Sequence, residues 1–431
     1  MLRLLLALLL FGVPVATRAA NRLVRGPYLQ SAAPDSMVLR WRTQRESKGL
    51  VRWGLSPDTA TNTTSHPGRL AEHVVRLAGL QPDTRYYYRV GSETNDFHHP
   101  VGEDFSFVTP PRPGLARPVR LWVVGDAGTA TTNQASVRNA FYHLHRRQPA
   151  DLWLMLGDNA YPEGTDAQYQ KAVFDMYQWI LRRTVLWPTL GNHDGQSADS
   201  ATLSGPYYDM FTLPTLGQCG GIPSGTEAYY SFDFGRVHFV CLDSHHSNRS
   251  ATGPMAAWLR ADLADTTADW IIAFFHHPPY TKGSHDSDKR SDSGGRMHDM
   301  RERFLPILEA GGCDLVLTGH SHSYERSHLL NGHYGASTHL ADSMVLDRGG
   351  GRVDLAGPYV KPPGHEPHRG TVYLVAGSSG QVSGGPLNHP ANWISLNKLG
   401  SLVIDIDGLE LQGQFLGDQG QLRDYFTLRK R

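Results

Sequence analysis

The stretch "DLVLTGHSHSYERS" (residues 314–327) joins a short apolar run to two histidines separated by one serine. A short continuous apolar run bounded by turn residues is typical of a buried strand. A pair such as His320 and His322 at the end of a strand fits either a turn or a metal site. The ends of the other predicted strands decide between these two interpretations.

Six further apolar runs resemble 314–317 and alternate with stretches of helical periodicity. They are residues 121–124, 152–156, 185–190, 237–241, 270–275 and 371–375. Between them, one apolar stripe at helical spacing comprises Val137, Ala140, Phe141 and Leu144, and a second comprises Tyr169, Val173, Met176, Tyr177 and Ile180. The alternation predicts an α/β fold in which helices cover the sheets.

Five of the runs end in residue types that bind metals. In open α/β sheets, ligands bind beyond the carboxyl ends of the strands, so these side chains are expected to gather. Each motif alone is common in turns, but five such motifs in succession indicate a site. In chain order the strand ends supply Asp126, then Asp158 and Tyr161, then Asn192, His193 and Asp194, then His276 and His277, and finally His320 and His322.

Residues 21–112 have a different pattern, which predicts an all-β domain. The segment "SMVLRWRT" (36–43) alternates apolar and polar residues, as a half-buried strand does. The segment "LQPDTRYYYRV" (80–90) resembles the tyrosine-corner region of fibronectin type III-like sandwiches. A proline-rich linker, "TPPRPGLARP" (109–118), follows, and we place the second domain at residues 113–431.

The N-terminal segment "MLRLLLALLLFGVPVATRAA" (1–20) has the basic start, apolar core and small-residue end of a cleavable signal peptide. We therefore expect a secreted or periplasmic protein. Lys plus Arg and Asp plus Glu each number 41, and this balance gives no reason to expect a nucleic-acid or membrane partner. Three cysteines are too few for a disulfide scaffold, and Cys219 is open to pairing or to remaining free.

Together the five motifs resemble the calcineurin-like metallophosphoesterases, and Tyr161 in "GDNAY" (157–161) narrows the resemblance to the purple acid phosphatases. The resemblance covers nearly the whole chain. It implies a calcineurin-like αββα sandwich as the catalytic domain, preceded by a fibronectin type III-like β-sandwich. It also implies two metal sites that share Asp158. One adds Asp126, Tyr161 and His322, and the other adds Asn192, His276 and His320.

The resemblance also implies the metals and the residues around them. A phenolate ligand suits Fe(III), with Fe, Zn or Mn as the second, divalent ion. His193, supported by Asp194, is expected to orient the substrate or act as an acid. His285 is expected to bind phosphate or protonate the leaving group, although a mobile surface loop is the alternative there. His277 is not expected to be a ligand, and the loop carboxylates are expected to be solvated, namely Asp286, Asp288 and Asp292.

The implied activity is hydrolysis of small phosphate monoesters by direct attack of a metal-bound hydroxide. A phosphodiesterase or nucleotide hydrolase would use the same metals and is the first alternative. A non-catalytic secreted adhesion or metal-binding protein, in which the β-sandwich carries the function, is the second. The sequence predicts neither the oligomeric state nor the physiological substrate.

Overall fold

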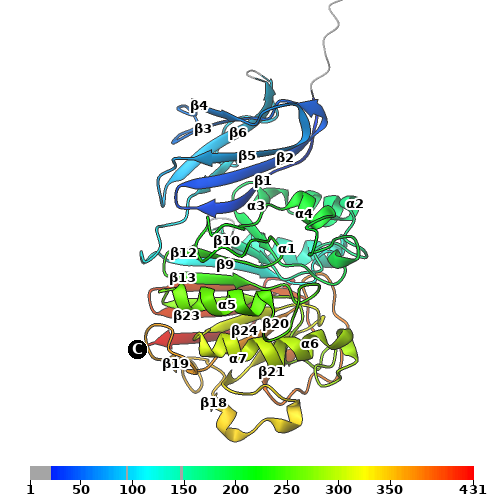
Figure 1. The fold of residues 1–431 in the computed structure, drawn as a ribbon, viewed down its shortest axis with the longest axis vertical. Coiled ribbons are helices and arrows are strands. Elements are labelled where there is room, and N and C mark those ends of the chain that lie inside the picture. Colours follow the sequence, from blue (N-terminus) through cyan, green and yellow to red (C-terminus); the bar gives the residue numbers. More distant parts are fainter. Residues whose placement is uncertain (1–20, 94–95, 146–148) are drawn as a thin grey trace, which may run out of the picture.

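The computed structural model describes residues 21–93, 96–145 and 149–431 (Figure 1). The predicted signal peptide, residues 1–20, lies outside the described residues. The chain forms an N-terminal β-sandwich, at the top of Figure 1, followed by an α/β domain built on two large sheets. The α/β fold predicted from the alternation of strands and helices is therefore confirmed.

The β-sandwich consists of a three-stranded and a five-stranded antiparallel sheet. The first contains β1 (Leu23–Ala33), β2 (Ser36–Ser47) and β5 (Leu70–Ala78). The second contains β4 (Asn62–Ser65), β3 (Leu50–Gly54), β6 (Arg85–Glu93), β7 (Asp96–Phe97) and β8 (Ser106–Val108). The Tyr86 hydroxyl accepts a hydrogen bond from the Gln81 amide at 2.8 Å, which is the contact that a tyrosine corner requires.

Strand β1 fixes the sandwich to the α/β domain. Its Tyr28 hydroxyl donates a hydrogen bond to the Met210 carbonyl at 2.7 Å, and the Gln30 amide donates to the Leu186 carbonyl at 2.7 Å. On β2, Arg40 reaches across to Thr212, which explains why this polar residue is buried although it alternates with apolar residues. Both faces of β1 and of the first half of β2 are therefore covered, whereas β5 has exposed residues at alternate positions.

The α/β domain contains two seven-stranded mixed sheets. The first runs β11 (Val185–Pro188), β10 (Leu152–Met155), β9 (Val119–Val124), β22 (Gly400–Asp407), β23 (Glu410–Gly417), β24 (Leu422–Lys430) and β19 (Tyr359–Lys361). The second runs β12 (Tyr230–Phe234), β13 (Val237–Cys241), β14 (Trp270–Phe274), β15 (Leu315–Thr318), β20 (Val372–Ala376), β16 (Tyr324–Ser327) and β21 (Asn392–Leu396). Strands β17 (Leu329–Leu330) and β18 (Val345–Asp347) form a separate pair. All seven predicted apolar runs form strands.

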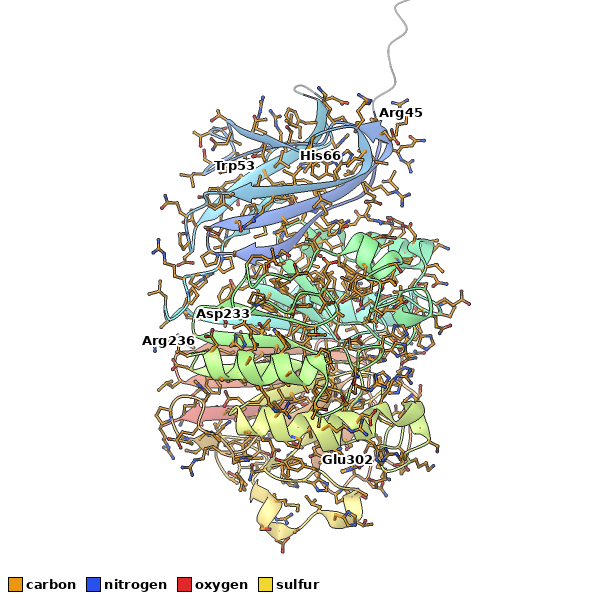
Figure 2. All side chains as sticks on the ribbon, in the orientation of Figure 1. Arg45, Trp53, His66, Asp233, Arg236 and Glu302 are labelled. Carbon is orange, nitrogen blue, oxygen red and sulfur yellow. The ribbon has the colours of Figure 1, made fainter. Side chains whose placement is uncertain are left out.

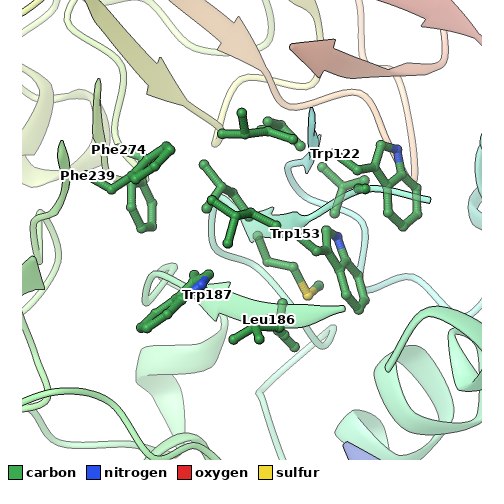
Figure 3. Packing of buried hydrophobic residues seen from close by; sticks show 14 of the residues in the cluster. Trp122, Trp153, Leu186, Trp187, Phe239 and Phe274 are labelled. Atoms are coloured by element: carbon green, nitrogen blue, oxygen red, sulfur yellow. The ribbon is translucent and has the colours of Figure 1, made fainter. Parts of the chain in front are cut away.

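Large aromatic side chains fill the space around these sheets (Figure 3). Trp187 of the first sheet stacks on Phe232 of the second, with ring centroids 3.8 Å apart. Trp122 stacks on Phe141 of a covering helix at 4.4 Å. The first contact joins the two sheets, and the second joins a sheet to its helical layer, so the core continues through successive layers.

Two helical groups cover the sheets. The first contains α1 (Thr132–His145), α2 (Asp166–Tyr169), η1 (Gln170–Asp175), α3 (Gln178–Leu181) and α4 (Pro206–Met210). The second contains α5 (Pro254–Asp265), α6 (Arg296–Asp299), η4 (Met300–Phe304) and α7 (Leu305–Ala310). Short 3₁₀ turns are η2 (Asp194–Gln196), η3 (Asp292–Gly295), η5 (Ser337–His339) and η6 (Asp342–Met344).

The helical stripes are only partly as expected. In α1, Val137, Ala140 and Phe141 are buried, but Leu144 is 50% exposed. The stripe from Tyr169 to Ile180 is not one regular helix, because the π-helical segment η1 interrupts it. A π turn is wider than an α turn and rotates the following residues, so Met176 is only half-buried while Tyr177 is buried.

Acidic and basic side chains are mixed on the surface, in agreement with the formal net charge of zero. Figure 2 shows side chains of both charges on the α/β domain, among them Asp233, Arg236 and Glu302.

No helix in the described part of the chain has both the length and the apolar character needed to cross a membrane. Cys219 is free and buried, as are the other two cysteines, so no disulfide forms among them.

A buried ion pair that joins the two sheets predicts a large stability effect. Arg326 on β16 donates two hydrogen bonds to Asp424 on β24, at 2.7 and 2.9 Å, and both side chains are almost completely buried. Replacing Arg326 with Met leaves the Asp424 charge unpaired in the interior. We expect Arg326→Met to lower the free energy of unfolding by about 3–5 kcal/mol in urea titrations.

The matched control is Arg352→Met, which removes the arginine from the exposed pair with Asp354. Exposed pairs contribute only about 0–1 kcal/mol. Equal losses in the two variants would contradict a structural role for the buried pair.

Candidate metal centre

The fold brings the seven predicted metal ligands together. Strands β9, β10 and β11 are parallel in one sheet, and β14 and β15 are parallel in the other. Their carboxyl ends meet where the two sheets face each other, so the loops that follow them share one region. These loops carry Asp126, Asp158, Tyr161, Asn192, His276, His320 and His322.

One group of donor atoms surrounds the Tyr161 hydroxyl. This oxygen lies 3.2 Å from Asp126 Oδ1, 3.1 Å from Asp158 Oδ2 and 3.2 Å from His322 Nε2. Three of the four side chains thus place oxygen atoms, and the fourth a nitrogen, around one small volume. Oxygen and imidazole donors of this kind suit a hard or intermediate metal ion.

A second group surrounds His276 Nε2. This nitrogen lies 3.0 Å from Asn192 Oδ1, 3.2 Å from His320 Nδ1 and 3.5 Å from Asp158 Oδ1. The Nδ1 atom of His276 donates to the Leu156 carbonyl at 2.8 Å, so a neutral ring has its lone pair on Nε2. Asp158 therefore presents one oxygen to each group, as a carboxylate between two metals would.

The backbone is strained at three of these residues. Asp126, Asp158 and His320 have φ angles of 53°, 51° and 66°, a left-handed conformation that is uncommon for residues other than glycine. Such strain is concentrated at functional sites, where the surrounding structure maintains it. Gly191 allows the close approach of the loops, because a Cβ atom there would lie 2.1 Å from the Asp158 nitrogen.

Electrostatics also fit a cation. Burial raises the pKa of Tyr161 well above its ordinary value, and the charges of Asp126 and Asp158 raise it further. Burial likewise raises the pKa of Asp126, although His276 opposes this effect. Burial would raise the pKa of Asp158 too, but the adjacent His276 lowers it below its usual range. Two carboxylates and a phenol in one buried volume form a donor set that positive ions stabilise.

His193 lies at the edge of both groups. Its Nδ1 atom donates to the Pro162 carbonyl at 2.5 Å, and its Nε2 atom lies 3.9 Å from Asp158 Oδ2. The side chain is 32% exposed, so it is accessible from solvent. This location fits the role expected from the sequence.

Asp194 differs from expectation, because none of its described partners is the His193 side chain. It is fully buried and accepts hydrogen bonds from the Tyr169 hydroxyl at 2.6 Å and from the backbone of Gly191 and Asn159 at 2.9 and 3.1 Å. Burial, together with the charge of Asp158, raises its pKa to about 6. The turn η2 directs this carboxylate inward, where it holds the loops that carry Asp158 and Asn192.

His285 lies over the second donor group. Its ring stacks on His320 with centroids 3.9 Å apart, and its Nδ1 atom donates to Asp292 Oδ1 at 2.8 Å. His277 is buried, and its Nδ1 atom lies 2.8 Å from the Ser244 hydroxyl. The structure thus brings His285 to the site and gives His277 a hydrogen-bond partner in Ser244, while one ring nitrogen of His277 also lies within 4.8 Å of ring nitrogens of His276 and His320.

The sequence analysis expected the loop carboxylates to be solvated, but in the structure they have specific partners. Asp286 and Asp288 both pair with Lys282, the latter at 2.9 Å, and Asp292 contacts His285. No periodic pattern marks these contacts in the sequence.

Sequence reasoning also missed residues next to His322. Its Nδ1 atom lies 2.8 Å from the Ser383 hydroxyl, and its Nε2 atom 3.3 Å from the Gln381 amide. The available signal was positional: their loop follows β20, which neighbours β15 in the sheet and ends at the same edge.

Comparisons with known proteins agree with this geometry. Residues 25–109 match the family model "Purple acid Phosphatase, N-terminal domain", and residues 119–324 match "Calcineurin-like phosphoesterase". Purple acid phosphatase 15 of Arabidopsis thaliana is 30% identical over 368 residues, which is 77% of this chain and 63% of the relative. Purple acid phosphatase 23 of the same plant is 29% identical over 281 residues, which is 59% of this chain and 57% of the relative. The chain thus spans less than two thirds of the length of these relatives.

Solved structures show the same fold. The purple acid phosphatase from yellow lupin (Lupinus luteus) seeds superimposes with a TM-score of 0.70 at 17% identity, over 95% of this chain and 75% of that one. The family implies a binuclear metal centre, and the two donor groups that share Asp158 fit one. By its two consecutive family domains and its relatives, the chain belongs to the purple acid phosphatase family of calcineurin-like phosphoesterases.

Proposed function

We propose that the chain is a phosphomonoesterase of the acid phosphatase type that hydrolyses small phosphate esters at a binuclear metal centre. One observation carries this proposal. The two oxygens of Asp158 face different donor groups, with Oδ2 3.1 Å from the Tyr161 hydroxyl and Oδ1 3.5 Å from His276 Nε2. A carboxylate between two donor groups would help to hold a pair of metals, which in two-metal hydrolases lie about 3.5–4 Å apart.

The donor atoms support a different kind of metal ion for each group. The group around Tyr161 would hold Fe(III), because a phenolate is a hard, anionic oxygen ligand. The group around His276 would hold a divalent ion, for which Fe, Zn and Mn all suit a set of amide, carboxylate and imidazole donors. When bound, the two ions would neutralise the phosphate oxygens and activate a water molecule for attack on phosphorus.

Two histidines would act on the substrate itself. His193 and His285 have side-chain exposures of 32% and 31%, whereas His276 is fully buried. The Nδ1 atom of His193 donates to Pro162 and that of His285 donates to Asp292, so each ring has its Nε2 atom available. From there His193 would orient the phosphate, and either residue, when protonated on both ring nitrogens, would donate its Nε2 proton to the departing alkoxide.

The same proposal includes the wider organisation of the chain. Residues 1–20 would act as a signal peptide that directs export. Residues 21–112 would form the sandwich domain and residues 113–431 the metallophosphoesterase domain. The hydrogen bonds from β1 to Leu186 on β11 and to Met210 on α4 indicate that the sandwich helps to hold the catalytic domain, because β11 leads into the loop that carries Asn192.

Replacing the bridging carboxylate tests the centre directly. In Asp158→Asn only one oxygen remains, so the side chain no longer links both groups. We expect metal content to fall from two ions per chain to one or none, and kcat/KM for nitrophenyl phosphate to fall by about 1000-fold or more, since the metals supply several kcal/mol. Elemental analysis and initial rates measure these changes.

Asp407→Asn, at an exposed position on β22, is the control. An Asp158→Asn protein with two ions and undiminished turnover would refute the proposal. Faster hydrolysis of the bis(nitrophenyl) ester than of the monoester by the wild-type protein would favour a phosphodiesterase. A metal-loaded protein inert toward both would favour a non-catalytic role.

The proposed phenolate ligand leads to a predicted difference in visible absorption between the wild type and a Tyr161 variant. If Tyr161 binds Fe(III) as a phenolate, Tyr161→Phe removes the donor responsible for the visible charge-transfer absorption. We expect the variant to lose this absorption while the divalent ion is retained, as measured by visible spectroscopy and elemental analysis of the same sample. Persistence of the absorption in Tyr161→Phe would exclude this residue as the chromophore.

A further inference from the structure

Asp292 and Ser293, which the sequence did not assign to the site, lie near the proposed ligand His320, on the side of its ring away from His276. The Nε2 atom of His320 lies 2.6 Å from the Ser293 hydroxyl. That hydroxyl lies 2.8 Å from Asp292 Oδ1, which also receives the hydrogen bond from His285 Nδ1. One carboxylate is thus connected to a proposed metal ligand and to a proposed substrate-binding histidine.

The direction of each hydrogen bond follows from the chemistry of the groups. An ionised carboxylate only accepts, so the single hydroxyl proton of Ser293 is donated to Asp292. Ser293 Oγ must then accept from His320, which places the ring proton on Nε2. A neutral imidazole has one such proton, so Nδ1 has the lone pair. This is the atom that lies 3.2 Å from His276 Nε2.

We propose that Ser293 and Asp292 are positioning residues that hold His320 with its Nδ1 lone pair directed at the second metal, and that Asp292 orients His285 at the same time. The inference rests on the proposed function, because it assumes that His320 is a ligand. Partners that fix the tautomer and orientation of a metal-bound histidine are a general feature of metal sites.

The conformation of the loop supports a specific use of the Ser293 hydroxyl. Ser293, Gly294 and Gly295 all have positive φ angles, of 54°, 60° and 81°. A glycine adopts this conformation without strain, whereas a serine there is unfavourable by about 1–2 kcal/mol. Backbone preference therefore does not explain a serine at this position, but its hydrogen bonds to His320 and Asp292 do.

The loop is fixed at its other end. Asp292 Oδ2 accepts a hydrogen bond from the Asp286 backbone at 2.8 Å, so both oxygens of Asp292 have partners. Lys282 pairs with Asp288 at 2.9 Å, and the Asp288 carboxylate also accepts from the Ser337 backbone at 2.8 Å. These contacts hold Asp292 at a constant distance from both histidines.

The same atoms suggest one competing arrangement. His285, Asp292 and His320 lie close enough for a nitrogen or oxygen of each to bind one additional cation. The Ser293 hydroxyl, however, is hydrogen-bonded to both His320 and Asp292. This contact favours a hydrogen-bonded chain, and the number of metal ions per chain separates the two arrangements.

The first experiment removes the hydroxyl without straining the loop. Ser293→Gly is expected to weaken retention of one of the two metal ions by about 10–100-fold, measured by metal content after dialysis against graded chelator. The melting temperature of the metal-free variant should be equal to or above that of the wild type, because glycine relieves the positive φ. If the loop had a purely structural role, Ser293→Gly would lower the melting temperature and leave metal retention unchanged.

A second variant restores an acceptor. Asparagine tolerates the left-handed conformation and has a side-chain oxygen, so Ser293→Asn should recover part of the lost metal affinity. Asp292→Ala should weaken the same ion and also raise KM or lower kcat for an alkyl phosphate, because His285 loses its partner. Asp407→Ala is the control, since it removes an exposed carboxylate on β22, outside this loop.

Each outcome decides one question. A wild-type protein that binds fewer than two ions overturns the proposed function, and the inference with it. If the wild type binds two ions and Ser293→Gly retains both as tightly, the positioning role is wrong. If the wild type binds three ions and Asp292→Ala loses one of them, the loop forms a cation site instead. Selective weakening of one of two ions, partly restored by Ser293→Asn, supports the inference.

Discussion

The structure depends on the concentration of negative charge around Asp158. Asp126 and Asp158 are both almost completely buried, with the Tyr161 hydroxyl within 3.2 Å of each. Burying ionised groups without compensation is strongly unfavourable, so this arrangement is consistent with folding only if cations or protons offset the charge. Two metal ions offset it while leaving the carboxylates ionised. The rest of the domain can be understood as the framework that holds these groups together.

That framework combines a strained backbone at three proposed ligands with hydrogen bonds from a buried carboxylate, Asp194. Asp126, Asp158 and His320 adopt left-handed backbone conformations immediately after buried strands. The sheets hold these turns in the strained conformation, because strands β9, β10 and β15 each have buried neighbouring strands on both sides. Asp194 adds hydrogen bonds to Gly191 and Asn159 from beneath. Rigid strands thus set the direction of the ligands, and buried polar contacts set their separation.

Many of the strands and the location of the site could be predicted, because an apolar run followed by potential metal ligands repeats along the chain. Apolar runs identified the strands, residue types at the strand ends indicated a site, and the family resemblance implied the seven donors that the structure brings together. The failures concern geometry that periodicity does not encode. Whether Tyr169 to Ile180 forms one helix depends on a local π turn, and whether Asp194 faces His193 depends on the turn η2. Asp292, in a polar loop, resembles any solvated acid until the fold places it beside His285.

The residues that sequence reasoning missed share one property, which is that they act through contacts distant in sequence. Ser293 is 27 positions from His320, and Ser383 is 61 positions from His322. Each contacts a ring nitrogen of a histidine in the "HSH" segment. Ser293 lies in the short turn η3, and Ser383 lies in a loop without regular secondary structure. Ligand types can be read from strand ends because the sheet orders them. The orientation of a ligand ring is set by the loop that packs against it, and the ion pairs of Lys282 with Asp286 and Asp288 help to hold the loop 281–295 beside His320. The chemistry of the metal centre therefore depends as much on these irregular segments as on the strands that define the family.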